Sequence, residues 1–250
     1  MLVSLLAFIT VFTVIVVVHE LGHFIMARKA GIKVYEFSIG FPFSPRLLTL
    51  FRHKETAFTV RLLPIGGFVA FSQGDDEDTE GLFAASCTKS ALVLSAGSLF
   101  NIIFAFILFV SVFVLGRHFP LIDAVLLSAK TVWAITSGTI AIFLNIFTGQ
   151  VTMEGLSGPV GIAVMAGRAA HTGISSLFFF TGVLSMSLGI MNLLPLPALD
   201  GGHVLMLFIE AIRKKPVHPK IYQAVTLVGL ALFLVLTVVV TYKDVVKVIA

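Results

Sequence analysis

Long uncharged stretches limit what this chain can fold into more than any other feature of its sequence. Only 12% of the 250 residues are charged and 58% are hydrophobic, whereas soluble domains carry about 25% charged residues. Each stretch reaches the roughly 18 residues that allow a helix to cross a bilayer. These stretches are 1–18, 90–116, 131–153, 169–199 and 221–242. The sequence therefore predicts an all-α polytopic membrane protein.

Basic residues are distributed unevenly, and this distribution predicts the orientation in the membrane. One group lies between the first and second stretches and consists of Arg28, Lys29, Lys33, Arg46, Arg52, Lys54, Arg61 and Lys89. The other lies before the last stretch and consists of Arg213, Lys214, Lys215 and Lys220. Loops rich in Lys and Arg remain cytoplasmic, so we expect both chain ends to lie outside. The net charge of +4 then marks topology, and no nucleic-acid partner is expected.

The first apolar stretch ends in His19-Glu20-Leu21-Gly22-His23. Two residues four apart on a helix lie about 40° apart around it and roughly 6 Å along it, so both imidazoles can reach one tetrahedral Zn²⁺. Glu20 can then face a water molecule at the metal. On a solvated helix the same motif can reflect paired surface charges, but ionisable residues in an apolar span are costly and usually functional.

A second unusual segment, Asn192-Leu-Leu-Pro-Leu-Pro-Ala-Leu-Asp-Gly-Gly202, offers a third metal ligand. Pro195 and Pro197 cannot continue a regular helix, so the chain is expected to open here. Irregular backbone at membrane depth is tolerated where it is buried in protein or lines a wet cavity. Asp200 is the candidate ligand, and the alternative is a simple proline kink with Asp200 at a helix end.

Together these motifs closely resemble the site-2 protease family of intramembrane zinc metalloproteases, in particular the bacterial regulator of sigma-E proteases. The resemblance also includes Gly97-Ser-Leu-Phe-Asn101 and spans nearly the whole chain. It implies that His19, His23 and Asp200 bind zinc and that Glu20 is the catalytic base. It further implies that Asn101 and Asn192 hold the substrate backbone.

The expected meeting of Asp200 with the two histidines also decides which stretches span the membrane. If residues 131–153 crossed, Asp200 would emerge at the opposite face from His19 and His23. We therefore interpret 121–150 as an external segment lying at the interface. This leaves about four transmembrane helices in a single domain of residues 1–250: about 2–27, 90–116, 174–199 with 192–202 unwound, and 221–242.

The loop after the first helix is expected to form strands. Residues 34–71 are rich in turn signals, and Thr56–Leu62 alternates Phe58, Val60 and Leu62 with smaller or polar residues. A plain cytoplasmic hairpin is one interpretation. The resemblance implies instead a membrane-dipping β element whose free edge receives an extended substrate. Residues 74–81 are expected to be a solvated acidic loop.

The predicted function is intramembrane endoproteolysis of single-span membrane proteins, such as anti-sigma factors or remnant signal peptides. The site would face the cytoplasmic side of a bacterial inner membrane. The alternative is a membrane metal transporter that uses the His/His/Asp site for transit. Many members of the family carry PDZ domains between the second and third spans, whereas here residues 117–120 lead almost directly into the external segment.

Overall fold

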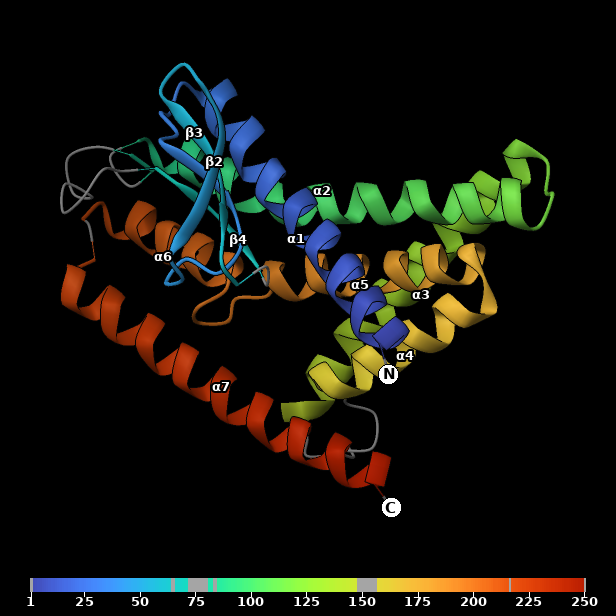
Figure 1. The fold of residues 1–250 in the computed structure, drawn as a ribbon. Coiled ribbons are helices and arrows are strands. Elements are labelled where there is room, and N and C mark those ends of the chain that lie inside the picture. The colour runs from blue at the N-terminus through green and yellow to red at the C-terminus, as the bar shows by residue number, and fades with distance from the viewer. Residues whose placement is uncertain are drawn as a thin grey trace. The chain divides into compact units, whose positions relative to one another are not determined.

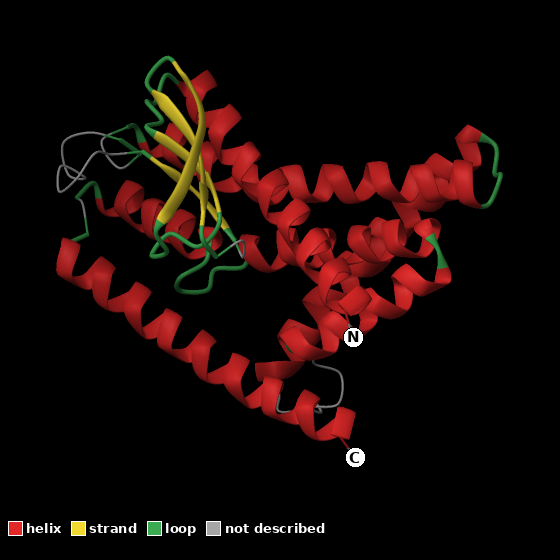
Figure 2. Cartoon of the chain, in the orientation of Figure 1, coloured by secondary structure: helices red, strands yellow, loops and turns green. Residues whose placement is uncertain are grey.

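The computed structural model describes residues 2–63, 66–71, 81–82, 85–147, 157–215 and 217–249. Within them the chain forms seven α-helices, a π-helical turn and a four-stranded sheet that follows the first helix (Figures 1 and 2). The prediction of a mostly helical polytopic membrane protein with a small sheet is confirmed. The expected acidic loop at 74–81 lies, except for Gly81, outside the described residues.

Five helices of the described chain are long and apolar enough to cross a membrane, against about four expected. They are α1 (Leu2–Ala30), α2 (Cys87–Ser111) with its π-helical continuation η2 (Val112–Gly116), α3 (Leu121–Phe147), α5 (Ile174–Leu193) and α7 (Pro219–Ile249). The additional one is α3, which has the lowest mean hydropathy of the five, 1.4 against 1.8–2.7. Its interfacial placement was argued from parity and stays a prediction.

Two helix ends bear on the expected boundaries. Helix α5 ends at Leu193, within the segment 192–202 that was expected to be unwound, because Pro195 disfavours helical backbone at the residue before it and offers no N–H. The last helix continues to Ile249 rather than ending at 242. Tyr242, Lys243, Asp244 and Lys247 interrupt the apolar stretch without ending the backbone hydrogen bonding, so the helix extends beyond the span expected from hydropathy.

Two short helices were not predicted. Helix α4 (Pro159–Thr172) follows Gly158 as its N-cap, and proline at the first helical position is a recognised start signal. Helix α6 (Asp200–Arg213) begins at the expected metal ligand itself. Both were overlooked because neither is long enough to span a membrane.

The chain divides into two compact units. The sheet unit comprises residues 12–101 and 192–222, and the helical unit comprises residues 1–11, 102–191 and 223–250. All of the metal-site candidates belong to the sheet unit. Each unit is described by itself below.

The sheet consists of β1 (Glu36–Ile39), β2 (Arg46–His53), β3 (Thr56–Arg61) and β4 (Gly67–Ala70). The strand order is β2-β3-β1-β4, with β1 parallel to β3 and antiparallel to β4. The expected strand at 56–62 is confirmed as β3. In the described chain β2 and β4 are the two edge strands.

Aromatic rings attach the sheet to the second half of α1, beside which it lies in Figure 1. The ring of Phe24 on α1 packs edge-on against Phe37 and Phe58, with centroids 5.7 and 5.6 Å away. Phe51 of β2 stacks on Phe58 at 4.4 Å. Such pairs stabilise by about 1 kcal/mol each beyond the area they bury, so they hold the sheet against the helix that carries the histidines.

A partly buried polar cluster around Glu36 connects three strands of the sheet. Its carboxylate accepts hydrogen bonds from Thr59 Oγ1 at 2.6 Å, Arg46 at 2.9 Å and Arg61 at 3.2 Å. Burial raises the pKa of Glu36, but these donors and cations outweigh it and the pKa lies below its ordinary value. The carboxylate therefore remains ionised and joins three strands.

The core of the helical unit is apolar, and a buried carboxylate joins two of its helices. Phe109, Phe113, Met186 and other buried side chains from α2, η2, α3 and α5 form the core. Asp244 of α7 is 5% exposed, and its Oδ2 accepts hydrogen bonds from the backbone N–H groups of Gly158 and Gly161, at 2.7 and 2.8 Å. The carboxylate thus caps the N-terminus of α4.

Replacing Asp244 by alanine should lower stability by about 2 kcal/mol or more, because two N–H groups at a buried helix start lose a charged acceptor. The midpoint of thermal unfolding in detergent measures the effect. Asp123→Ala is the matched control, since Asp123 is exposed in the first turn of α3 and should change stability little. Equal midpoints for the two variants would show that the cap contributes nothing.

Candidate metal centre

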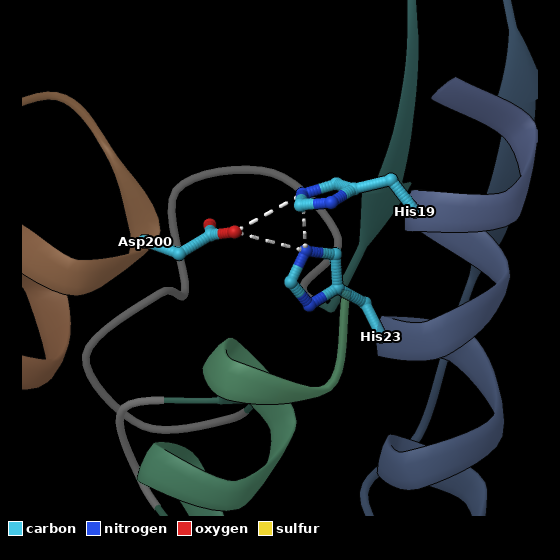
Figure 3. A group of neighbouring side chains, drawn as sticks. All are labelled: His19, His23 and Asp200. Atoms are coloured by element: carbon cyan, nitrogen blue, oxygen red, sulfur yellow. Dashed lines mark hydrogen bonds and ion pairs between the residues drawn. The ribbon is translucent and has the colours of Figure 1, made fainter. Parts of the chain in front are cut away.

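Helix α1 presents both histidines of the motif to the interior of the sheet unit (Figure 3). His19 and His23 are each 7% exposed, and their Nε2 atoms lie 3.1 Å apart. The spacing of four residues places the rings one above the other on one helix face. The expected convergence of the two imidazoles is present in the structure.

Asp200 approaches the histidines from the start of α6, as Figure 3 shows. Its Oδ2 lies 3.0 Å from Nε2 of His19 and 3.5 Å from Nε2 of His23. Among the described residues this is the one group of three His, Cys, Asp or Glu side chains whose ligand atoms converge. The structure therefore brings together the three residues that the sequence proposed as ligands, which lie far apart in the chain.

The irregular segment between α5 and α6 delivers Asp200 to this position. After Leu193 the chain makes two tight turns, with Leu196 N–H donating to Leu194 O at 2.7 Å and Leu199 N–H to Leu196 O at 3.3 Å. A Cβ on Gly201 would lie 2.3 Å from Leu194 O, and one on Gly202 would lie 2.1 Å from Leu196 O. Only glycine allows this close approach, so the Gly pair holds the folded-back turn beside Asp200.

The three ligand atoms fit zinc. Zinc–ligand distances of about 2.0–2.1 Å in a tetrahedron place neighbouring ligand atoms about 3.3 Å apart, and the three observed separations are 3.0, 3.1 and 3.5 Å. Nδ1 of His23 donates to Val93 O at 2.8 Å, so the neutral ring directs the lone pair of Nε2 to the other two ligands. Oδ2 of Asp200 is buried and lacks an aligned hydrogen bond from the described residues, as suits an oxygen that faces a cation.

Gly97 of α2 lies directly against the rings of the two histidines. A Cβ on Gly97 would lie 2.5 Å from Nε2 of His23 and 2.8 Å from Cε1 of His19. Gly22 of α1 lies opposite, where a Cβ would meet Ala96 O at 2.5 Å and Cα of Gly97 at 2.9 Å. The two glycines let α1 and α2 approach to backbone contact, and the space that a side chain at 97 would fill is left to the ligands.

Glu20 lies beside the ligands and next to the sheet. A Cβ placed on Gly67, the first residue of β4, would lie 3.1 Å from Cγ of Glu20. Glu20 is only partly buried and is not one of the three converging ligands. This position suits the predicted base, which has to reach water rather than the metal.

The two asparagines predicted to bind substrate lie in different surroundings. Asn101 is fully buried on α2, with its amide nitrogen 3.4 Å from Nδ1 of His19. Asn192 is partly exposed in the last turn of α5, just before the chain opens. The contacts of Val93 O and Gly97 with the histidines were not predicted from the sequence, in which the Gly97–Asn101 motif was the only signal for the second.

Comparison with known proteins decides the family. The profile of peptidase family M50 matches residues 7–236. This chain belongs to peptidase family M50. The expected membership of the site-2 protease group is confirmed, and the chain is a zinc metalloprotease.

Bacterial relatives support the assignment over nearly the full chain. The zinc metalloprotease RasP of Shouchella clausii is 26% identical, with 98% of this chain and 99% of the relative covered. The regulator of sigma-W protease RasP of Bacillus subtilis is 25% identical over 97% and 98%. A putative zinc metalloprotease of Clostridium perfringens is 29% identical over 94% and 96%.

These alignments also show a difference in length. The alignment with the Shouchella protein extends over 416 residues, against 250 in this chain. The relative therefore carries a substantial segment that this chain lacks. The expectation that the missing segment is a PDZ region between the second and third spans stays a prediction.

Proposed function

We propose that this M50 zinc metalloprotease is an intramembrane endopeptidase that cleaves the transmembrane segments of single-span membrane proteins. The observation that carries the proposal is the convergence of His19, His23 and Asp200 beside Glu20 on a helix that can span a membrane. A catalytic site on a membrane-spanning helix can act on peptide bonds within the bilayer, which soluble proteases cannot reach.

Each residue has a defined task in the proposed reaction. His19, His23 and Asp200 hold the zinc ion, which supplies Lewis acidity that polarises the scissile carbonyl and makes water more acidic. The carboxylate of Glu20 accepts a proton from the attacking water and delivers it to the nitrogen of the departing amine. No side chain forms a covalent bond to the substrate in this scheme.

The edge of β4 offers a place for the substrate backbone. Its first residue, Gly67, lies against Glu20, and among the described residues β4 has a strand partner only on its β1 side. An unwound substrate can add to such an edge through main-chain hydrogen bonds. We propose that this pairing extends the substrate next to the base, and that the partly exposed amide of Asn192 binds one of the peptide groups that unwinding frees.

The substrate class follows from the position of the site and from the relatives. One relative is named a regulator of sigma-W protease, which makes membrane-anchored anti-sigma factors the first candidates, with remnant signal peptides as the second. The basic residues around the sheet and after α6 support a position of these segments at the cytoplasmic face of a bacterial inner membrane. The N-terminus then lies outside.

Metal transport is the competing function, because a His/His/Asp site could also pass an ion. Transport does not need Glu20, and it uses further sites along a path. In the described chain a single group of converging ligands is found, which favours proteolysis.

Reconstitution tests the proposal. In liposomes, the protein should cleave a single-span substrate within its membrane segment. Two glycines at that segment's centre should raise the rate by up to about 30-fold, because each glycine weakens a helix by about 1 kcal/mol. Product masses locate the cut, and a chelator should stop the reaction until zinc is restored. A matched all-leucine segment is the control. Zinc flux without any cleavage would establish the transporter instead.

A further inference from the structure

The burial of Asn101 separates it from the substrate and places it behind a metal ligand. Its side chain is 0% exposed, and its amide nitrogen lies 3.4 Å from Nδ1 of His19, on the side of the ring away from Asp200. Rotation of the amide by 180° exchanges its nitrogen and oxygen, which coordinates alone rarely distinguish. A residue in this position can act on the reaction only through His19.

The chemistry of His19 defines what Asn101 must supply. Nε2 of His19 faces Nε2 of His23 at 3.1 Å and Oδ2 of Asp200 at 3.0 Å. To bind a cation, this Nε2 must carry a lone pair, so the proton of the neutral ring must reside on Nδ1. Nδ1 then needs an acceptor, and the side-chain oxygen of an asparagine amide provides one when the oxygen rather than the nitrogen faces the ring.

His23 shows the same arrangement with a different acceptor. Its Nδ1 donates to the backbone oxygen of Val93, at 2.8 Å. Both acceptors belong to α2, two turns apart, with Gly97 between them against the two rings. Helix α2 thus supplies a hydrogen-bond acceptor for Nδ1 of each imidazole. Loss of such an acceptor on the second nitrogen of a ligating histidine commonly lowers metal affinity by 10–100-fold.

We propose that Asn101 is a positioning residue that fixes the tautomer and the ring orientation of His19 through a hydrogen bond from Nδ1–H to the amide oxygen, and that it does not bind substrate. The proposal rests on the assignment of His19 as a zinc ligand. It differs from the role that the family resemblance implied for Asn101.

Asn101→Leu removes the acceptor at similar volume and should weaken zinc binding 10–100-fold in a competition with a chromophoric chelator. Asn101→Asp keeps an acceptor and should bind zinc at least as tightly as the wild type. The absorption spectrum of the Co²⁺-substituted protein should change in the leucine variant and remain similar in the aspartate variant. Ser90→Ala, which removes a buried hydroxyl of α2 that bonds to Leu82 O, is the control and should leave zinc affinity unchanged.

Kinetics separate the positioning role from substrate binding. The leucine variant should lose kcat at limiting zinc and regain most of it at excess zinc, with KM for the substrate unchanged. A raised KM at saturating zinc, or wild-type zinc affinity in the leucine variant, would overturn the proposal. If the leucine variant does not fold, the aspartate variant tests the proposal. A tenfold loss of zinc affinity in the aspartate variant would also overturn it. Absence of proteolysis in the wild type would refute the proposed function but would leave these zinc measurements valid.

Discussion

Glu20→Gln is expected to reduce kcat for substrate cleavage at least about 10³-fold while the protein retains one zinc ion. A glutamine amide has nearly the same shape as the carboxylate but cannot accept the proton of the attacking water, and loss of a general base commonly costs about 10²–10⁴-fold. Because Glu20 is not among the converging ligand atoms, its replacement should leave metal affinity within a few-fold of the wild type.

Product formation and zinc content should be measured on the same preparation of this variant. Glu55→Gln is the matched control, because Glu55 lies exposed in the turn before β3 and pairs with Arg28. It should cleave at the wild-type rate. If Glu20→Gln cleaved normally, the proton transfer would have to be assigned to another group, and loss of zinc from it would make Glu20 part of the metal site.

Gly97→Ala is expected to weaken zinc binding at least about 100-fold, which would be more than most losses of a single supporting hydrogen bond. The new methyl group would lie 2.5 Å from Nε2 of His23 and 2.8 Å from Cε1 of His19. The ring of His23 cannot simply tilt away, since its Nδ1–H is held by Val93 O. Either the ligands separate or α1 moves from α2, and both outcomes disrupt the tetrahedral geometry.

Gly138→Ala provides the control for the general effect of replacing a glycine in a helix. A Cβ at Gly138 of α3 would meet no atom within 4 Å, so this variant should bind zinc normally and be stabilised by about 0.5–1 kcal/mol. Metal content after dialysis and thermal midpoints distinguish the two variants. Full zinc occupancy in Gly97→Ala would show that the centre is wider than its structure indicates.

The sequence predicted those parts of the molecule that are set by local chemistry. Uncharged stretches located the long helices, because a bilayer demands length and low polarity. The motif at His19 and His23 could be interpreted because helix geometry fixes the distance between residues four apart. Asp200 followed from Pro195, Pro197 and the need for a third ligand, and the structure brings it to the histidines.

Apart from the meeting of Asp200 with the histidines, contacts between distant residues were not predicted. The parallel pairing of β1 with β3 and the position of β4 beside Glu20 depend on how four strands meet, which no single strand encodes. Helices α4 and α6 were not predicted because both are too short to span a membrane. The burial of Asn101 follows from the close packing of α1 on α2 and was not predicted; the substrate role that the resemblance implied for it stays a prediction.

Because Asp200 begins a short helix far along the chain from the histidines, a bound ion would link two distant segments. His23 and Asp200 lie about 180 residues apart in the chain, so a bound ion acts as a cross-link that closes a large ring. In the simple polymer treatment a permanent cross-link of this length restricts an unfolded chain by about 5 kcal/mol, whereas an ion that dissociates on unfolding stabilises the folded chain by its binding free energy. Removal of the ion should therefore release the segment around 194–200 to added proteases before the long helices unfold.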